Sequence, residues 1–509
     1  MNDPGGKKVY LVGAGPGDPE LLTLKARRLL EAAEVVIYDH LASPELLNLA
    51  PAAAERIYAG KKKSNHALSQ EQICELLVER GLRGLNVVRL KGGDPYLFGR
   101  GGEEAEALAD AGVPFEVVPG VTSALGIAAY TGVPLTHRDH TSAVTFVTGH
   151  DVSKIDWSKA GASDTLVVFM GLSNISQIAE CLIAGGRSAD TPAMAVRWGT
   201  RPDQAVVAGT LGTLPALVRE RGMRPPASLV VGDVVLLRGK LDWFGKLPLS
   251  GQTVVVTRPR EQAAALSVPL RRLGAEVIEL PTIEIRNAPD YGPLDTAIAG
   301  LEAYDWLIFT SANGVRCFLE RLDASPKDWR AIRGRVCAIG PATAEALTRF
   351  HLKVDVMAAE YVAEGLLRSL EGFELAGSRV LIARAAVARD VLPVELRARG
   401  AIVDVVDAYC TLPPEGLADR LRETLGRRPD WITFTSSSTV QNVLDAAGSG
   451  ALAGIGTASI GPVTSATLRK GGADVAAEAV PYTAAGLVAA IVAGTVRRRQ
   501  SGTARFGPV

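Results

Sequence analysis

The sequence predicts an α/β protein of several domains with mostly parallel sheets. Strand-like apolar runs alternate with helix-like segments along the whole chain, beginning with Val9–Val12, Leu21–Ala32 and Val35–Tyr38. A stretch without periodicity at about 243–250 separates a first half from a second half. The second half also repeats its own motifs, which indicates that it contains two related parts.

The composition is that of a soluble, cytoplasmic protein. A chain of 509 residues is too long for one ordinary core, and its apolar (47%) and charged (22%) fractions are globular. The net charge of +0 argues against a broad nucleic-acid-binding surface. The longest late apolar run, Gly486–Val496, is shorter than the roughly 20 residues of a membrane helix. The five dispersed cysteines form no C-x-x-C pair and fit a reducing compartment.

These features predict two domains and a tail. We expect the first domain at 1–245 and the second at 246–496. The tail, Arg497–Val509, is basic and unpatterned, and we expect it to be disordered.

The repeat in the second half consists of short motifs in the same order. The segment DWLIFTS at 305–311 is repeated as DWITFTS at 430–436. The segment IGPAT at 339–343 is repeated as IGPVT at 460–464. More weakly, Arg258 aligns with Arg384, and Gly274 aligns with Gly400. We infer two similar lobes that face one another across a ligand-binding cleft.

Three loops in the first half follow predicted strands and are rich in glycine or small residues. They are Gly13–Asp18, Gly92–Glu104 and Pro119–Ala124. Glycines let backbone amides approach a ligand closely. A dinucleotide-binding loop would have glycine at position 18, where this chain has aspartate, so an NAD site is the weaker interpretation and a purely structural turn is another. Three such loops at strand ends indicate one extended ligand site.

These loops resemble the tetrapyrrole methylase family, and within it the uroporphyrinogen-III C-methyltransferases. The resemblance runs from about Val9 to Arg238, and its most specific motif is GGDPYLFGRGGEE at 92–104. The other matching motifs are Tyr38–Leu41, Gly60–Lys61, Pro119–Ser123, Pro134–Arg138 and Trp198–Thr200.

The resemblance implies a two-domain fold that holds S-adenosylmethionine between its domains, and it suggests a homodimer. It implies that Asp39 accepts a proton and that Lys61 donates one. From the residues alone, Asp39 is alternatively a helix N-cap, and Lys61 is part of a solvated basic turn. The implied cofactor contacts are Pro16, Gly92, Gly93, Asp94, Leu97, Thr122, Ser123, Met170 and Gly199.

Uroporphyrinogen III carries eight carboxylates, so its binding site should present cationic side chains. Four candidates lie in or beside the motif loops, namely Arg89, Lys91, Arg100 and Arg138. We expect no metal site, because no suitable ligand cluster is present.

The second half resembles uroporphyrinogen-III synthase from about Gly251 to Gly494. The motifs that carry this resemblance are Val256–Pro259, Phe309–Asn313, Ile339–Pro341, Val406–Thr411, Phe434–Ser436 and Ile460–Thr464. The resemblance implies a cofactor-free enzyme with one lobe at 251–282 plus 411–495 and another at 285–407. That family closes hydroxymethylbilane into a macrocycle and inverts the last pyrrole ring, ring D.

Tyr409 matches the tyrosine that the family is proposed to use in hydroxyl departure, and it is alternatively a hinge residue. Ser311, Ser436 and Thr464 are expected to donate to substrate carboxylates or to cap helices. Together the two halves predict a bifunctional enzyme of tetrapyrrole biosynthesis. It would methylate uroporphyrinogen III at C2 and C7 to give precorrin-2, for siroheme or cobalamin. The alternative is a methyltransferase whose second half binds or regulates without catalysis.

Overall fold

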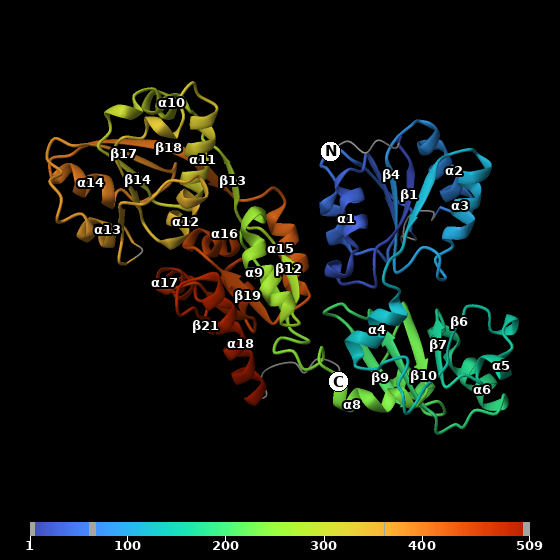
Figure 1. The fold of residues 1–509 in the computed structure, drawn as a ribbon. Helices are drawn as coiled ribbons and strands as arrows, with labels where there is room; N and C mark the ends of the chain where they lie inside the picture. Colours follow the sequence, from blue (N-terminus) through green and yellow to red (C-terminus); the bar gives the residue numbers. More distant parts are fainter. Residues whose placement is uncertain (1–5, 61–67, 361, 502–509) are drawn as a thin grey trace. The chain divides into compact units, whose positions relative to one another are not determined.

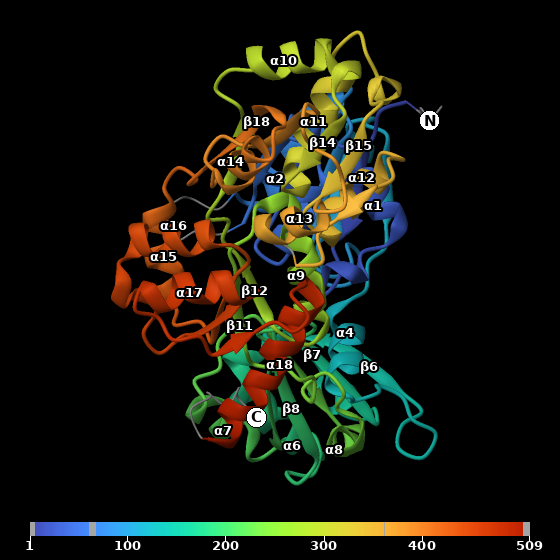
Figure 2. The ribbon, with the colours of Figure 1, turned by 90° about the vertical axis from the view of Figure 1, so that its left-hand side faces the viewer.

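A computed structural model describes residues 6–60, 68–360 and 362–501 of the chain. Two compact units are present, one formed mainly by residues up to 253 and the other mainly by residues 254–491 (Figures 1 and 2). Each unit contains two β-sheets with helices packed on them. The predicted α/β class with parallel-rich sheets is therefore confirmed.

The first sheet of the first unit is entirely parallel. Its strand order is β3-β2-β4-β1-β5, and β1 and β4 are buried along their full length. The carboxyl ends of these strands meet at one edge, where ligands bind in such sheets. The strands are β1 (Val9–Gly13), β2 (Val35–Tyr38), β3 (Glu55–Tyr58), β4 (Val87–Lys91) and β5 (Phe115–Val118), and the helices are α1 (Leu24–Glu31), α2 (Gln70–Leu82) and α3 (Gly101–Asp110).

The second sheet, of order β6-β7-β10-β8-β9, differs from the predicted parallel pattern. Only β6 and β7 pair in parallel, and the other neighbours are antiparallel. The short segment 198–204 joins β8 to β9 directly, and a connection of this length permits only antiparallel pairing. The strands are β6 (Val144–Thr148), β7 (Thr165–Phe169), β8 (Pro192–Arg197), β9 (Ala205–Thr210) and β10 (Ala227–Val231), and the helices are α4 (Ser123–Thr131), α5 (Trp157–Ala160), α6 (Ile175–Ala184), α7 (Leu214–Glu220) and α8 (Arg238–Leu241).

The two sheets of the second half repeat one another. One has the order β12-β11-β19-β20-β21, and the other has the order β18-β17-β14-β15-β16 with β13 added at its edge. The first contains β11 (Thr253–Val256), β12 (Glu276–Glu279), β19 (Trp431–Phe434), β20 (Gly456–Ser459) and β21 (Ala477–Glu478). The second contains β13 (Glu284–Asn287), β14 (Trp306–Phe309), β15 (Arg335–Ala338), β16 (Val356–Met357), β17 (Arg379–Ala385) and β18 (Ile402–Leu412).

Helices follow the strands of both sheets in matching positions. Ser311 caps α11 after β14, and Ser436 caps α16 after β19, each through its side-chain oxygen. The prediction of two similar lobes is confirmed by this order. The helices are α9 (Arg260–Arg272), α10 (Gly292–Ala299), α11 (Ala312–Asp323), α12 (Pro341–Arg349), α13 (Ala363–Ser369), α14 (Val391–Ala398), α15 (Leu417–Gly426), α16 (Ser437–Ala447), α17 (Pro462–Lys470) and α18 (Ala484–Gln500).

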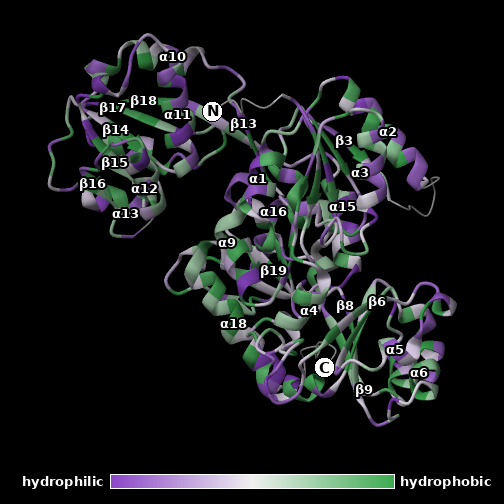
Figure 3. Cartoon of the chain, turned by 45° about the vertical axis from the view of Figure 1, so that its right-hand side comes forward, coloured by the Kyte–Doolittle hydropathy of each residue, from purple (hydrophilic) through white to green (hydrophobic). Residues whose placement is uncertain are grey.

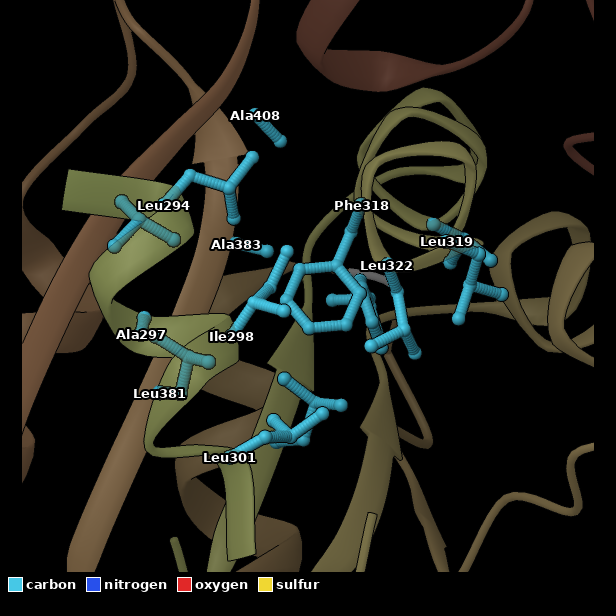
Figure 4. Close-up of a cluster of buried hydrophobic side chains, with 14 of the residues drawn as sticks. Leu294, Ala297, Ile298, Leu301, Phe318, Leu319, Leu322, Leu381, Ala383 and Ala408 are labelled. Atoms are coloured by element: carbon cyan, nitrogen blue, oxygen red, sulfur yellow. The ribbon is translucent and has the colours of Figure 1, made fainter. Parts of the chain in front are cut away.

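Each sheet is stabilised by buried apolar side chains, which colour the strands green in Figure 3. In the lobe that contains β14, Phe318 of α11 lies beside Ile298 of α10 (Figure 4), in the same buried cluster as Leu381 of β17. Burying a side chain of this size contributes roughly 1.5–3 kcal/mol. Within the described residues, no helix is long and apolar enough to cross a membrane.

The end of the chain differs from the prediction in part. Residues 497–500 were expected to be disordered, but they form the last turn of α18. The Arg499 guanidinium donates to the backbone oxygen of Ser250 at 2.8 Å. The prediction was wrong here because a helix can end in several arginines, which interact favourably with its C-terminal dipole.

Candidate active sites

The three loops of the first half approach one another backbone to backbone. Gly15 and Gly93 exchange backbone hydrogen bonds of 3.2 and 2.7 Å. A Cβ on Gly13 would lie 2.5 Å from the Cα of Gly120 and 2.7 Å from the backbone oxygen of Gly93. Only glycine permits this approach at position 13, so the glycines pack the loops into one unit.

Two aspartates hold these loops by accepting hydrogen bonds. Asp94 accepts from the backbone nitrogen of Tyr96 within its own loop and from that of Gly120 in the third loop, at 2.8 and 3.0 Å. Asp18 accepts from the Tyr130 hydroxyl at 2.5 Å and caps a short 3₁₀ turn. Burial and the hydrogen bond to Asp18 raise the pKa of Tyr130 well above its usual range. This arrangement explains why position 18 carries aspartate rather than the glycine of a dinucleotide loop.

A cavity of about 550 Å³ opens at these loops, between the two sheets of the first half. This volume lies within the roughly 300–1,000 Å³ typical of small-molecule sites. All of the residues predicted to contact the cofactor line the cavity, namely Pro16, Gly92, Gly93, Asp94, Leu97, Thr122, Ser123, Met170 and Gly199.

Strained backbone is concentrated at the same cavity. The described residues include seven non-glycine residues with positive φ, and four of these line it. Such conformations cost on the order of 1–3 kcal/mol each and gather at functional sites. The four are Phe98 (φ 53°), Arg100 (φ 58°), Met170 (φ 54°) and Trp198 (φ 50°).

Asp39 lies at the cavity wall, directly after β2. Its Oδ1 accepts from the backbone nitrogen of Leu41 at 3.0 Å, and its Oδ2 accepts from the Arg89 guanidinium at 3.3 Å. The alternative role of Asp39 as a helix cap is not observed, because Ser43 is the N-cap residue of the turn that begins at Pro44. Arg89 therefore orients a carboxylate that faces the cavity.

A buried charge network lies behind Asp39. The carboxylate of Glu104, which is 0% exposed, accepts through one oxygen from Arg89 Nε at 3.2 Å and from Lys91 Nζ at 2.7 Å. Burial and the neighbouring Arg89 charge lower the pKa of Lys91, while Glu104 opposes that shift. Two cations and two carboxylates balance within this network, so Arg89 and Lys91 are paired inside the protein although both line the cavity.

The other two cationic candidates differ in position. Arg100 lines the cavity and pairs with Glu103 at 2.6 Å, and that hydrogen bond raises the pKa of Arg100. Arg138 is exposed and is not among the residues that line the cavity. Lys61 lies outside the described residues.

Several residues in or behind the cavity wall were missed by sequence reasoning. Glu104 was part of a recognised motif, but its role as the partner of two cations depends on burial that a motif does not reveal. His150, Ser173 and Ser228 follow or belong to strands or turns of the second sheet, and no local motif marks them. All except Glu104 line the cavity.

In the second half, Tyr409 lies on β18 and is 6% exposed. Its hydroxyl is 3.0 Å from the Ser311 hydroxyl, and it also interacts with the Asn313 side chain. Burial raises the pKa of Tyr409, while hydrogen bonds from its two neighbours oppose that shift. The structure thus brings Tyr409 and Ser311 together, as two predicted site residues.

Ser436 and Thr464 lie in the other lobe. The Ser436 hydroxyl accepts from the backbone nitrogen of Thr439 at 3.3 Å and lies 3.0 Å from the Ser438 hydroxyl. Thr464 is 4% exposed and lies inside α17, whose N-cap residue is Gly461. The expectation that Thr464 caps a helix was therefore wrong, because the Gly-Pro pair begins this helix earlier.

In the described parts of the chain, no group of three or more His, Cys, Asp or Glu side chains is arranged to hold a metal ion.

Residues 8–215 match the family of tetrapyrrole (corrin/porphyrin) methylases, and residues 264–489 match the family of uroporphyrinogen-III synthase HemD. The chain is 38% identical over 447 residues to the porphyrin biosynthesis protein HemD of Ruminiclostridium josui. This alignment covers 86% of this chain and 88% of that protein.

A second relative matches only the first half. The siroheme synthase of Chromobacterium violaceum is 51% identical over 250 residues, which cover 48% of this chain and 53% of that protein. The match thus spans about half the length of the siroheme synthase. The crystal structure of uroporphyrin-III C-methyl transferase from Thermus thermophilus, complexed with S-adenyl homocysteine, is 44% identical, with a TM-score of 0.40. The alignment with this crystal structure covers 45% of the present chain and 99% of the crystallised chain.

Proposed function

Because this chain belongs to the family of porphyrin biosynthesis proteins that join a tetrapyrrole methylase to a uroporphyrinogen-III synthase, we propose that it carries out two successive reactions. The second half would close hydroxymethylbilane to uroporphyrinogen III with inversion of ring D. The first half would then methylate that product at C2 and C7 to give precorrin-2. The observation that carries this proposal is that every predicted cofactor residue lines one cavity beside Asp39.

The cavity suits S-adenosylmethionine, which supplies an electrophilic methyl group on sulfur when bound. Position 92 has no room for a side chain, because a Cβ there would clash with Leu41, and Gly93 has a φ of +68°. These glycines let the second loop pack closely against Leu41 and adopt a left-handed turn, with its backbone in the cavity wall. Pro16, Thr122 and Met170 would hold the cofactor from three separate segments. Holding two reactants in line is the main requirement of such a transfer.

After transfer, the methylated pyrrole carbon bears four carbon substituents and no hydrogen, so the positive charge left on the ring is removed by loss of a proton from a neighbouring methylene carbon or pyrrole nitrogen. Asp39 is placed to accept it, because its carboxylate faces the cavity and is held by Arg89. The paired charges of Glu104 and Lys91 keep Arg89 in position. We propose that Lys61 supplies a proton, as the resemblance implies. Arg100 and Arg138 are proposed to bind the substrate carboxylates.

In the second half, Tyr409 and Ser311 are placed to assist loss of the substrate hydroxyl. Burial keeps the Tyr409 hydroxyl protonated, so it can donate a hydrogen bond to a departing oxygen. Ser436 and Thr464 are proposed substrate contacts of the other lobe, although Thr464 is nearly inaccessible. No cofactor is required for this reaction.

This proposal includes the domain limits 1–245 and 246–496. It also includes the two lobes of the second domain, at 251–282 plus 411–495 and at 285–407. A homodimer formed through the first half and a cytoplasmic location are part of it as well. The product would enter siroheme or cobalamin synthesis.

A coupled assay with the full chain tests both reactions. Hydroxymethylbilane and S-adenosylmethionine should yield a methylated type III tetrapyrrole, and omission of S-adenosylmethionine should yield uroporphyrinogen III. If only the spontaneous type I isomer forms, while added uroporphyrinogen III is still methylated, the second half is non-catalytic. If neither product forms, both proposed activities are wrong.

A further inference from the structure

Arg258 is a partly buried cation in the second half that has no carboxylate partner among the described residues. It follows β11, at the carboxyl end of that strand. One terminal nitrogen lies 3.5 Å from Gln262 Oε1, and the buried Nε has no hydrogen-bond partner. Removal from water lowers the pKa of Arg258. Cations removed from water are normally paired, so this partly buried guanidinium is available to an anion that the described chain does not supply.

The internal repeat provides a matched comparison. Arg384 lies on β17, which occupies the position of β11 in the other sheet. Its Nε also lacks a partner, but a terminal nitrogen pairs with Asp390 at 2.6 Å, and the other donates to the Arg389 backbone oxygen at 3.0 Å. The alignment that places Arg258 opposite Arg384 places Ala264 opposite Asp390. One lobe thus neutralises its arginine internally, and the other lacks the residue that would do so.

Arg258 is also connected to the site around Tyr409. Gln262, which accepts from Arg258 four residues earlier in the chain, donates through Nε2 to Asn313 Oδ1 of the other lobe at 2.7 Å. Asn313 lies in the first turn of α11, next to Ser311, and interacts with the Tyr409 hydroxyl. These contacts lie within one compact unit, and two side chains, Gln262 and Asn313, connect the guanidinium to the hydroxyls of Tyr409 and Ser311.

We propose that Arg258 is the principal carboxylate-binding residue of the second half, and that it binds an acetate or propionate side chain of the linear tetrapyrrole substrate in a charge-assisted, forked hydrogen bond. The planar guanidinium matches a carboxylate with two parallel N–H donors. Arg384 has no such role, because Asp390 already occupies its terminal nitrogen. This inference rests on the proposed synthase activity for the identity of the ligand.

The test compares Arg258→Gln with Arg384→Gln in the full chain. Steady-state cyclisation of hydroxymethylbilane should show a KM at least tenfold higher for Arg258→Gln, with kcat changed less than threefold. Arg258→Lys keeps the charge but not the fork, and its KM should lie between those of wild type and Arg258→Gln. Arg384→Gln should leave KM within about twofold. Methylation of supplied uroporphyrinogen III and the thermal unfolding midpoint report whether each variant is folded.

An unchanged KM in folded Arg258→Gln, or equal increases for both arginine variants, would overturn the proposal. If Arg258→Gln does not fold, Arg258→Lys decides by the same KM criterion. If the wild type does not cyclise the substrate, the proposed synthase function is wrong. The role of Arg258 is then tested by tetrapyrrole binding alone. Fluorescence titration with uroporphyrin III should then show a binding component that Arg258→Gln weakens at least tenfold and Arg384→Gln leaves unchanged. Identical titrations for wild type and Arg258→Gln would remove Arg258 from any tetrapyrrole site.

Discussion

The two halves build their sites in opposite ways. In the first half, backbone geometry dominates, because glycines bring three loops together and four strained residues line the cavity. Its buried charges are already paired through Glu104. In the second half, the proposed site consists of side-chain hydroxyls around Tyr409 and the Arg258 guanidinium, which has no carboxylate partner among the residues that the structure describes.

This difference indicates which kind of substitution should impair the activity of each site. A site formed by closely packed backbone is sensitive to an added methyl group, because backbone atoms cannot move aside. A site formed by side chains is sensitive to the loss of single polar groups, while its framework persists. The predictions below use this contrast, and each measures both reactions in the same protein.

The largest effect is expected from Gly120→Ala. The new Cβ would lie 2.7 Å from the Cα of Gly13 and would clash with the backbone oxygen of Gly93. Separating the loops by about 1 Å should lower methylation by more than about 100-fold, because transfer depends on fine positioning. Binding of S-adenosylhomocysteine, measured by calorimetry, should also be lost, while cyclisation is retained.

Gly102→Ala is the matched control, because a Cβ at this position has nothing within 4 Å. It lies in the same loop-and-helix motif, within α3, and alanine favours a helix over glycine by about 1 kcal/mol. Methylation should stay at the wild-type rate. If Gly120→Ala and Gly102→Ala lower the methylation rate equally, close backbone contact is not the reason that these glycines are needed.

Asp39→Ala should lower methylation by about 100-fold, the lower end for loss of a positioned general base. Cofactor binding should persist, because the Asp39 carboxylate contacts Arg89 and the backbone of Leu41 rather than the packed loops. Single-turnover methylation and S-adenosylhomocysteine titration measure the two effects separately. Lost binding would mean that the residue is structural.

Tyr409→Phe should slow cyclisation by about tenfold, since one donor near the departing hydroxyl is lost, and leave methylation unchanged. Tyr304→Phe is a matched control in the same lobe. Its hydroxyl donates to Asp404 at 2.7 Å and has no contact with Ser311. A stability loss of about 1 kcal/mol is expected for either lost hydrogen bond. If both variants slow cyclisation equally, the effect of Tyr409 is one of stability only.

The sequence predicted the first site more completely than the second. The GGDPYLFGRGGEE motif and its neighbouring loops are local, and strand ends of a parallel sheet necessarily meet, so their convergence follows from the topology. The repeat likewise predicted the paired lobes, because identical strand-turn-helix motifs fold alike. The antiparallel sheet was missed because each of its strands looks the same in either direction.

What the sequence did not reveal depends on burial and on pairing between distant residues. Arg89 and Lys91 seemed free to bind substrate until the structure placed Glu104 between them. Thr464 was predicted to cap a helix or to contact substrate, but it is buried inside α17, whose N-cap residue is Gly461. In each case the decisive partner is either far along the chain or set by packing, and no local pattern encodes it.

The smallest predicted effect concerns alkaline pH, where the two sites should diverge. Burial and Arg89 lower the pKa of Lys91, so this ammonium loses its proton below the usual range near 10.4 and its ion pair with Glu104 is then lost. Burial raises the pKa of Tyr409, so its hydroxyl stays protonated as pH rises. Methylation should therefore decline by a few-fold as pH rises, and it should do so at lower pH than cyclisation.

Lys91→Arg tests the assignment, because a guanidinium remains charged at such alkaline pH. Its methylation rate should be lower at neutral pH, since the larger group fits a buried position poorly, but its alkaline decline should move to higher pH. Rates of both reactions measured from pH 7 to 10 in one buffer series provide the comparison. The assignment would be wrong if both reaction rates of the wild type fall at the same alkaline pH and Lys91→Arg does not shift this fall. Another group that affects both assays would then control the pH dependence.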